Sequence, residues 1–202
     1  QMRLLRRRFN PISVAQLAQI LDAKEPMPPR ACVVTFDDGW FDNHAFALPI
    51  LQLHSIPAMV FIATDYIGTD TCFWQERIAR RLFNAWRAGK HSQQLAALGL
   101  VIANSADESE ALIDVRRLIA TMKGATPEEL RDWINSTIGM LDATAGPAAE
   151  TGDDRFMSWN QARAISASGL LAIGSHARTH RPLTSLSAAQ LRDELRQSRR
   201  TI

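Results

Sequence analysis

Two short segments, far apart in the chain, carry the side chains best suited to metal-assisted chemistry. The first is the string Thr35-Phe36-Asp37-Asp38-Gly39, which follows an apolar run. The second contains His176 and His180, two imidazoles four residues apart that also follow an apolar run. One carboxylate with two histidines is the ligand set of a metal site that keeps open coordination positions. The other carboxylate would then be available as the general base that a hydrolytic metal site needs.

Each segment also has a simpler interpretation. Two adjacent carboxylates repel each other unless a cation lies nearby, and a turn at Gly39 could bring Asp37 and Asp38 toward one cavity. Alternatively, the two aspartates only cap a following helix. His176 and His180 could share one face of a helical turn or lie on an ordered loop, and alone they could be ordinary surface residues. The two segments together favour the metal site.

The elements around these segments predict an α/β fold. Apolar runs predict strands at about 31–36, 58–63 and 170–174, and helical spacing predicts helices at about 14–21 and 43–54 and after the serines at 158 and 187. A β-α-β order implies parallel strands, and sites in parallel α/β folds form at the carboxyl ends of the strands. Both segments fall at such ends, so we expect them to share a pocket.

Residues from about 72 to 156 show a different pattern, with helix signals and no strand signal. Apolar residues at helical spacing predict helices at about 73–86 and 108–122. A third helix should begin at Thr126, which is followed by a proline and then by an acid at the third position. Small, polar residues predict a loop from Ala143 to Asp154. We interpret this region as an all-helical insertion, serving either as a scaffold or as a lid.

Composition is that of an ordinary globular chain of 202 residues, with 46% hydrophobic and 22% charged residues. The net charge of +2 does not require a nucleic-acid partner, and the arginine clusters are interpreted as solvated helix faces. No apolar stretch reaches the roughly 18 residues of a membrane-spanning helix, so no transmembrane segment is predicted. Cys32 and Cys72 do not form a paired motif.

The two segments resemble known sequence motifs. The string Thr35–Gly39, followed by Asp42-Asn43, resembles the first motif of the polysaccharide deacetylases, the NodB-homology group of carbohydrate esterases. The stretch from Gly174 through His180 to Leu183 resembles the second motif of that family, although Ser175 precedes His176 and Ala177 takes the usual hydroxyl position. The resemblance implies a partial or distorted (β/α) barrel of the polysaccharide deacetylase type with an all-helical insertion.

The resemblance also implies a role for each residue. Asp37 matches the catalytic base of the family, Asp38 its metal-binding aspartate, and His176 and His180 its two metal-binding histidines. The implied cofactor is Zn²⁺ or another divalent metal such as Co²⁺. The implied reaction is the removal of N- or O-linked acetyl groups from a carbohydrate. Trp40 could stack on a sugar ring as a substrate-binding residue, or it could simply be packed.

We further expect residues 1–202 to form a single NodB-like domain that is truncated at both ends, with a helical lead-in over 1–30 and the insertion over 72–156. Later motifs of the family are absent before Ile202, so we expect this piece to have little activity by itself. Two alternatives remain besides the deacetylase. One is a non-catalytic carbohydrate-binding relic, and the other is an iron oxygenase that uses the same ligand set.

Overall fold

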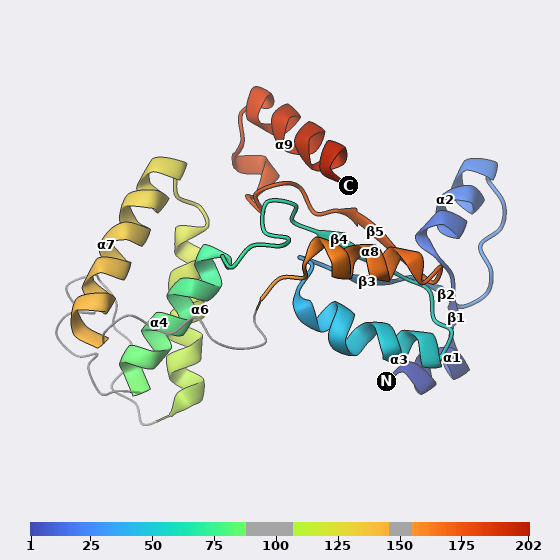
Figure 1. Ribbon diagram of the computed structural model, residues 1–202, viewed down its shortest axis with the longest axis horizontal. Helices are drawn as coiled ribbons and strands as arrows, with labels where there is room; N and C mark the ends of the chain where they lie inside the picture. The colour runs from blue at the N-terminus through green and yellow to red at the C-terminus, as the bar shows by residue number, and fades with distance from the viewer. Residues whose placement is uncertain (88–106, 146–154) are drawn as a thin grey trace. The chain divides into compact units, whose positions relative to one another are not determined.

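Helices and short parallel strands alternate in the computed structural model, which describes residues 1–87, 107–145 and 155–202 (Figure 1). The strands are β1 (Asn10–Pro11), β2 (Ala31–Cys32), β3 (Val34–Phe36), β4 (Ala58–Ile62) and β5 (Leu171–Ser175). The helices are α1 (Met2–Arg8), α2 (Val14–Ala23), η1 (Asn43–Ala47), α3 (Leu48–Leu53), α4 (Trp74–Arg87), α6 (Glu108–Met122), α7 (Pro127–Ala145), α8 (Trp159–Ala167), η2 (Leu183–Ser185) and α9 (Ala188–Thr201).

The strands pair in parallel, as the β-α-β order predicts. One sheet has the order β3-β4-β5, and a second pairs β1 with β2. The predicted strand over 31–36 is interrupted at Val33, so its first part pairs with β1 and its second part with β4. The residues that the structure describes form open sheets, without a closed barrel. The α/β class is therefore confirmed.

The segment predicted as a helical lead-in, residues 1–30, contains a short strand between its helices. It contains α1 and α2, but Asn10 and Pro11 between them form β1, which pairs with Ala31 and Cys32. The sequence pattern does not predict this strand, because two residues are too few to show an alternation of apolar and polar side chains. The strand exists because the backbone of another segment lies beside it.

The central strand is the most buried element of the sheet. Ala58, Val60 and Ile62 of β4 are buried, whereas the alternate residues are half-buried, because successive side chains of a strand point to opposite faces. Helix α8 packs against β5 and contacts η1 (Figure 1). Its buried Ala162 and Ile165 fit that position. The central strand is thus held between two neighbours whose carboxyl ends carry the two polar segments.

Helix starts follow the local signals in the sequence. Ser13, Ser158 and Ser187 each accept a hydrogen bond from the backbone of a glutamine three residues later, and that glutamine side chain bonds back to the serine backbone. These capping boxes confirm the predicted starts of α2, α8 and α9. The helix predicted at 43–54 begins with the π turn η1 and continues as α3. In a regular α-helix the ring of Pro49 would clash with the carbonyl four residues earlier, and the wider turn relieves that clash.

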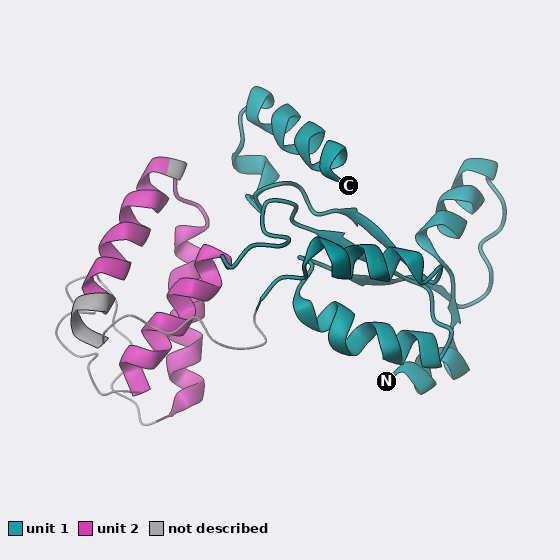
Figure 2. Ribbon diagram, viewed as in Figure 1, with its two compact units in different colours: residues 1–71, 152–202 teal, residues 72–151 magenta. Residues whose placement is uncertain are grey.

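The chain divides into two compact units, residues 1–71 with 152–202 and residues 72–151 (Figure 2). Unit 2 contains α4, α6 and α7, and its described residues include no strand, as predicted. The core of unit 2 is made by residues from all three helices: Ile78, Leu82, Ala85, Ala111, Val115, Ile119, Ile138 and Leu141.

Helix α7 begins at Pro127 after Thr126, as predicted, but runs to Ala145. The predicted loop from Ala143 is therefore wrong for its first three residues. Alanine favours a helix, and the first glycine of the predicted loop, Gly146, comes only after them. Residues 146–154 of that predicted loop lie outside the described residues. No helix within the described ranges is long and apolar enough to cross a membrane.

Candidate metal centre

The acidic and histidine segments meet at one edge of the β3-β4-β5 sheet. Asp37 follows Phe36, the last residue of β3, and His176 follows Ser175, the last residue of β5. The register places Phe36 opposite Val60 of β4, and Ile62 of the same strand opposite Ser175. Because the carboxyl ends of parallel strands lie at the same edge, the two segments come close although about 140 residues separate them.

The turn after β3 depends on its glycine. Asp38 and Gly39 have φ angles of 75° and 87°, in the left-handed region. A Cβ atom added to Gly39 would lie 2.8 Å from side-chain atoms of both Ile62 and Ile67. The Ala63 amide donates to the Asp38 carbonyl at 3.2 Å, and the Met157 amide donates to the Gly39 carbonyl at 2.9 Å. These contacts hold Asp38 at the end of the sheet in a conformation that a non-glycine residue adopts only when its surroundings impose it.

Three of the predicted side chains converge. The Oδ1 atom of Asp38 lies 3.4 Å from Nε2 of His176 and 3.2 Å from Nε2 of His180. One ligand atom from each of the three residues lies within 4.8 Å of the others. All three side chains are partly exposed, at 23%, 36% and 26% for Asp38, His176 and His180. A carboxylate and two imidazoles facing one accessible point suit a divalent ion such as zinc and leave coordination positions open.

The carboxylate of Asp38 is held from two sides. Its Oδ1 atom faces the histidines, and its Oδ2 atom accepts a hydrogen bond from the indole Nε1–H of Trp40 at 3.1 Å. Partial burial would raise the pKa of Asp38. Four interactions outweigh this effect of burial and lower the pKa of Asp38 below its ordinary value. They are the hydrogen bond with His180, the charge of His180, the hydrogen bond from Trp40 and the charge of His176. The carboxylate thus stays ionised, which is the form that binds a cation.

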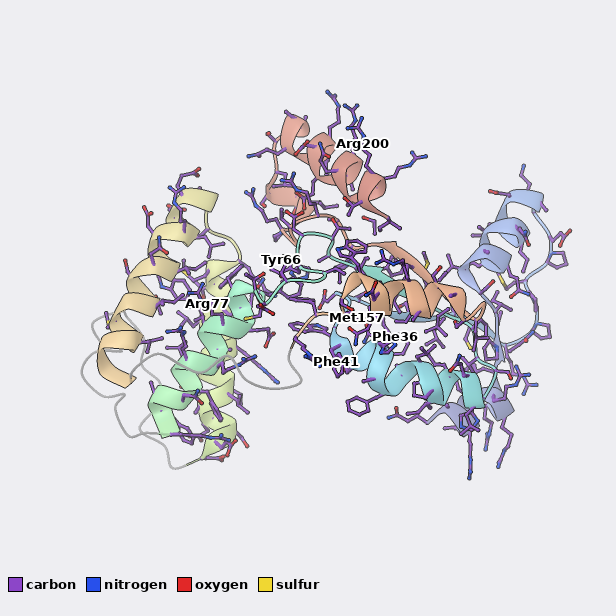
Figure 3. The ribbon with its side chains drawn as sticks, viewed as in Figure 1. Phe36, Phe41, Tyr66, Arg77, Met157 and Arg200 are labelled. Atoms are coloured by element: carbon purple, nitrogen blue, oxygen red, sulfur yellow. The ribbon has the colours of Figure 1, made fainter. Side chains whose placement is uncertain are left out.

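Trp40 is itself stacked on Phe156, with ring centroids 4.3 Å apart and planes 16° apart. Phe156 also contacts Tyr66, at a centroid distance of 5.2 Å (Tyr66 is labelled in Figure 3). One face of the indole is therefore covered by another ring, and its N–H bonds to Asp38. The structure places Trp40 beside the site, where it orients the carboxylate.

Asp37, the predicted base, is exposed beside this cluster. Its backbone carbonyl accepts from the Gly39 amide at 2.9 Å. Its side chain is not part of the three-residue ligand group. An exposed carboxylate next to a metal-ligand group is accessible to water and substrate, as proton transfer requires.

The two histidines lie on an ordered loop, not on a helical turn. Ala177 and His180 have φ angles of 62° and 57°, so the segment cannot continue as a right-handed helix. The residues that follow β4 bond to this loop: the Thr64 amide donates to the Ala177 carbonyl at 3.3 Å, and the Asp65 amide donates to the Arg178 carbonyl at 3.0 Å. Together with the bond from Ala63 to Asp38, three consecutive amides connect the acidic turn to the histidine loop.

The sequence reasoning missed two residues behind the histidine loop. Glu194 and Ser198 of α9 are 4% and 0% exposed, and both bond to the loop. A usable signal is present in the sequence, since Leu191, Glu194 and Ser198 share one helix face at the spacing of a buried stripe. A carboxylate and a hydroxyl on such a stripe indicate buried polar partners.

Comparison with known proteins agrees with the motifs. The sequence model described as polysaccharide deacetylase matches residues 24–152, a range that includes the acidic turn and ends before the histidine loop. The poly-beta-1,6-N-acetyl-D-glucosamine N-deacetylases of Escherichia coli strains K12 and O157:H7 are each 30% identical over 83 residues. That match covers 39% of this chain and only 12% of either relative.

Two solved structures are similar at low identity. The deacetylase domain of BpsB from Bordetella bronchiseptica matches 96% of this chain and 57% of its own, with a TM-score of 0.46 and 20% identity. The de-N-acetylase from Aggregatibacter actinomycetemcomitans matches 87% of this chain and 41% of its own, with a TM-score of 0.40 and 18% identity. The family assignment rests on the sequence match, which spans more than half of the chain: this chain belongs to the polysaccharide deacetylase family.

Proposed function

We propose that this chain carries the metal site of a hydrolase that removes acetyl groups from a polysaccharide or oligosaccharide, with Asp38, His176 and His180 as metal ligands and Asp37 as catalytic base. The observation that carries the proposal is the convergence of the three ligand atoms within 4.8 Å. The E. coli relatives are N-deacetylases of poly-beta-1,6-N-acetyl-D-glucosamine, which favours an N-linked acetyl group. We further propose that unit 1 is a partial (β/α) barrel of the deacetylase type and that residues 72–156 are its helical insertion.

Each residue would contribute a defined step. When bound, a divalent ion such as zinc supplies Lewis acidity to an acyl carbonyl and to the attacking water. His176 and His180 present Nε2 toward the same point as Asp38 Oδ1, so these three atoms would hold the ion. Asp37 would accept the proton of the attacking water at a carboxylate oxygen, since its side chain is exposed and not needed as a ligand.

Trp40 is proposed to act on the substrate in a restricted way. Because Phe156 covers one face of the indole, that face does not stack on a sugar ring. The bond from Nε1 to Asp38 supports a second role as a positioning residue for a metal ligand. The substrate-binding role remains a prediction.

Zinc titration of the purified chain by isothermal calorimetry tests the ligand set. The parent should bind one zinc ion. Asp38→Ala, His176→Ala and His180→Ala should each weaken binding by at least about 100-fold, because losing a direct ligand should exceed the ~10–100-fold cost of losing an outer partner. Trp40→Phe should fall within that smaller range. His54→Ala, a histidine of the same unit outside the cluster, is the matched control and should bind like the parent.

The substitution Asp37→Asn tests whether Asp37 acts as the catalytic base or as a metal ligand. The variant should bind zinc like the parent but lose acetate release from N-acetylglucosamine oligomers, measured with the full-length protein, by about 100-fold or more. A folded parent chain that binds neither zinc nor cobalt would reject the proposed site and favour a non-catalytic carbohydrate-binding protein. Loss of zinc binding in Asp37→Asn would show that the roles of the two aspartates are assigned incorrectly.

A further inference from the structure

Helix α9 contacts the histidine loop through two buried polar side chains. The first is Glu194, whose Oε1 atom accepts three hydrogen bonds from the loop: the Arg178 amide at 2.9 Å, the Thr179 amide, and the Thr179 hydroxyl at 2.8 Å. Its Oε2 atom lies 3.9 Å from Nε of Arg178. Glu194 is only 4% exposed, so hydrogen bonds from the loop replace those that water would make to its carboxylate.

The second contact lies one helical turn further along α9. The hydroxyl of Ser198, which is fully buried, accepts a hydrogen bond from the Ser175 hydroxyl at 2.8 Å. The Ser175 oxygen in turn accepts from the Ala177 amide at 3.2 Å. Residues four apart on a helix lie on the same face. One face of α9 therefore bonds to both ends of the histidine loop.

The loop residues that bond to α9 directly precede the two proposed metal ligands in the chain. Ser175 directly precedes His176, and Thr179 directly precedes His180. A hydrogen bond on the residue before a ligand restricts the backbone that sets the direction of the imidazole. This restriction matters here because His180 has a left-handed φ of 57°, a conformation that persists only where surrounding contacts impose it.

Filling space does not explain this arrangement. Burying a carboxylate is costly, and a well-packed apolar side chain of similar volume is often as stable or more stable at such a place. The Oε1 atom of Glu194 accepts from the backbone amides of Arg178 and Thr179. The guanidinium of Arg178 has other partners, Asp193 at 3.2 Å and Asp65 at 3.4 Å. The chemistry of Glu194 thus fits the loop backbone more closely than the neighbouring guanidinium.

We propose that α9 is the support of the histidine loop, with Glu194 as the positioning residue of His180 and Ser198 as that of His176. The proposal rests on the proposed function for the identity of the ligands. Its structural content concerns the loop alone: without the acceptor of Glu194, the segment from Ser175 to His180 loses its fixed backbone conformation. The two imidazoles then no longer face Asp38 together, while the rest of the unit keeps its fold.

The test compares two substitutions of the same residue. Glu194→Leu fills the space but offers no acceptor, whereas Glu194→Gln keeps a carbonyl oxygen for the three donors and loses only the charge. Glu194→Leu should weaken zinc binding by about 10–100-fold, the range found for outer partners of metal ligands, and Glu194→Gln should restore most of this loss. Asp193→Asn removes a charge from the adjacent, half-exposed residue that contacts Arg178 and should bind zinc like the parent.

Two further readouts separate positioning from general stability. The d–d absorption of the cobalt(II)-loaded protein reports ligand geometry, and it should change in Glu194→Leu and return toward the parent in Glu194→Gln. Hydrogen exchange of the metal-free protein should be at least about 10-fold faster for the amides of residues 175–180 in Glu194→Leu, with strand β4 unchanged. If Glu194→Leu does not fold, Ser198→Ala undergoes the same measurements and should change the same segment.

The outcomes distinguish this inference from the proposed function. Exchange in residues 175–180 that is unchanged in both Glu194→Leu and Ser198→Ala overturns the support role, whether or not the parent binds zinc. Zinc binding that is as strong in Glu194→Leu as in Glu194→Gln also overturns the support role, because filling the space would then suffice. A parent that binds no metal, with faster exchange in the variants, rejects the proposed metal site and leaves the support of the loop by α9 in place.

Discussion

At the scale of single residues, Asp38 shows how one carboxylate can be prepared for a cation. Its Oδ1 atom faces two imidazoles, its Oδ2 atom accepts the indole N–H of Trp40, and its backbone lies in a left-handed turn before Gly39. The hydrogen bonds and nearby charges outweigh burial and keep its pKa low. Asp37 lacks these partners and stays exposed, so adjacent residues of the same type occupy environments that suit different roles.

Substitution of Gly39 tests how much the turn depends on the missing side chain. Gly169 also has a positive φ, of 68°, but a Cβ atom there would meet no atom within 4 Å. Gly169→Ala should therefore cost only the backbone term of about 1–2 kcal/mol. Gly39→Ala should cost about 1–3 kcal/mol more, because the new Cβ atom would overlap Ile62 and Ile67. Chemical denaturation measures both, and equal losses would contradict the predicted steric contribution.

At the scale of elements, capping determines where the helices begin. Serine and glutamine start α2, α8 and α9, whereas Thr126 and Glu129 start α7. The carboxylate of Glu129 accepts from the Thr126 amide at 2.8 Å. That backbone bond is the largest cause of the lowered pKa of Glu129, and a hydrogen bond with the Thr126 side chain is the second. Only α7 therefore has a cap among these four that can be titrated.

The lowered pKa of Glu129 predicts a direction for the pH dependence of α7. A carboxyl whose pKa is lower in the folded state contributes stability above its unfolded pKa, and this contribution is lost as the pH falls through the folded pKa. The difference in melting temperature between the parent and Glu129→Gln should thus be constant well above the ordinary carboxyl pKa of 4.5 and shrink as the pH falls below it. The control is Glu128→Gln, which removes a carboxylate that does not bond to the Thr126 amide. A difference that grows on acidification would contradict the capping role.

At the scale of the whole molecule, the two units have separate cores. The three proposed metal ligands, Asp38, His176 and His180, all belong to unit 1, and the three described helices of unit 2 bury their own cluster. Zinc binding should therefore depend on the core of unit 1 and not on that of unit 2. The scaffold and lid interpretations of the helical insertion both remain predictions.

A pair of matched leucine substitutions tests this separation. Leu82 in unit 2 and Leu51 in unit 1 are 0% and 1% exposed, so each change to alanine should cost about 2–5 kcal/mol. Leu82→Ala should lower the melting temperature of unit 2, which hydrogen exchange in α4 measures. It should leave zinc affinity unchanged at temperatures where unit 1 stays folded. Leu51→Ala should weaken zinc binding as unit 1 loses stability. Loss of zinc affinity in Leu82→Ala under those conditions would contradict independent cores.

The sequence by itself determined the elements and the motifs of this protein. Strands, helix starts and the two polar segments follow from local signals, namely apolar runs, capping pairs and residue types at short spacing, and such signals act within one or two turns of the chain. For the same reason the sequence also indicated which side chains have metal-binding chemistry. The family match covers the acidic turn and ends before the histidine loop, so the metal-binding roles stay predictions.

Only the tertiary structure decided which groups meet. The pairing of β1 with β2, the stacking of Trp40 on Phe156 and the contacts of Glu194 and Ser198 with the histidine loop all join residues distant in the chain. Such contacts depend on strand register and on the path of the backbone, which no local pattern encodes. The β4 strand, lying between two parallel neighbours, is the physical reason that Asp38 reaches His176 and His180.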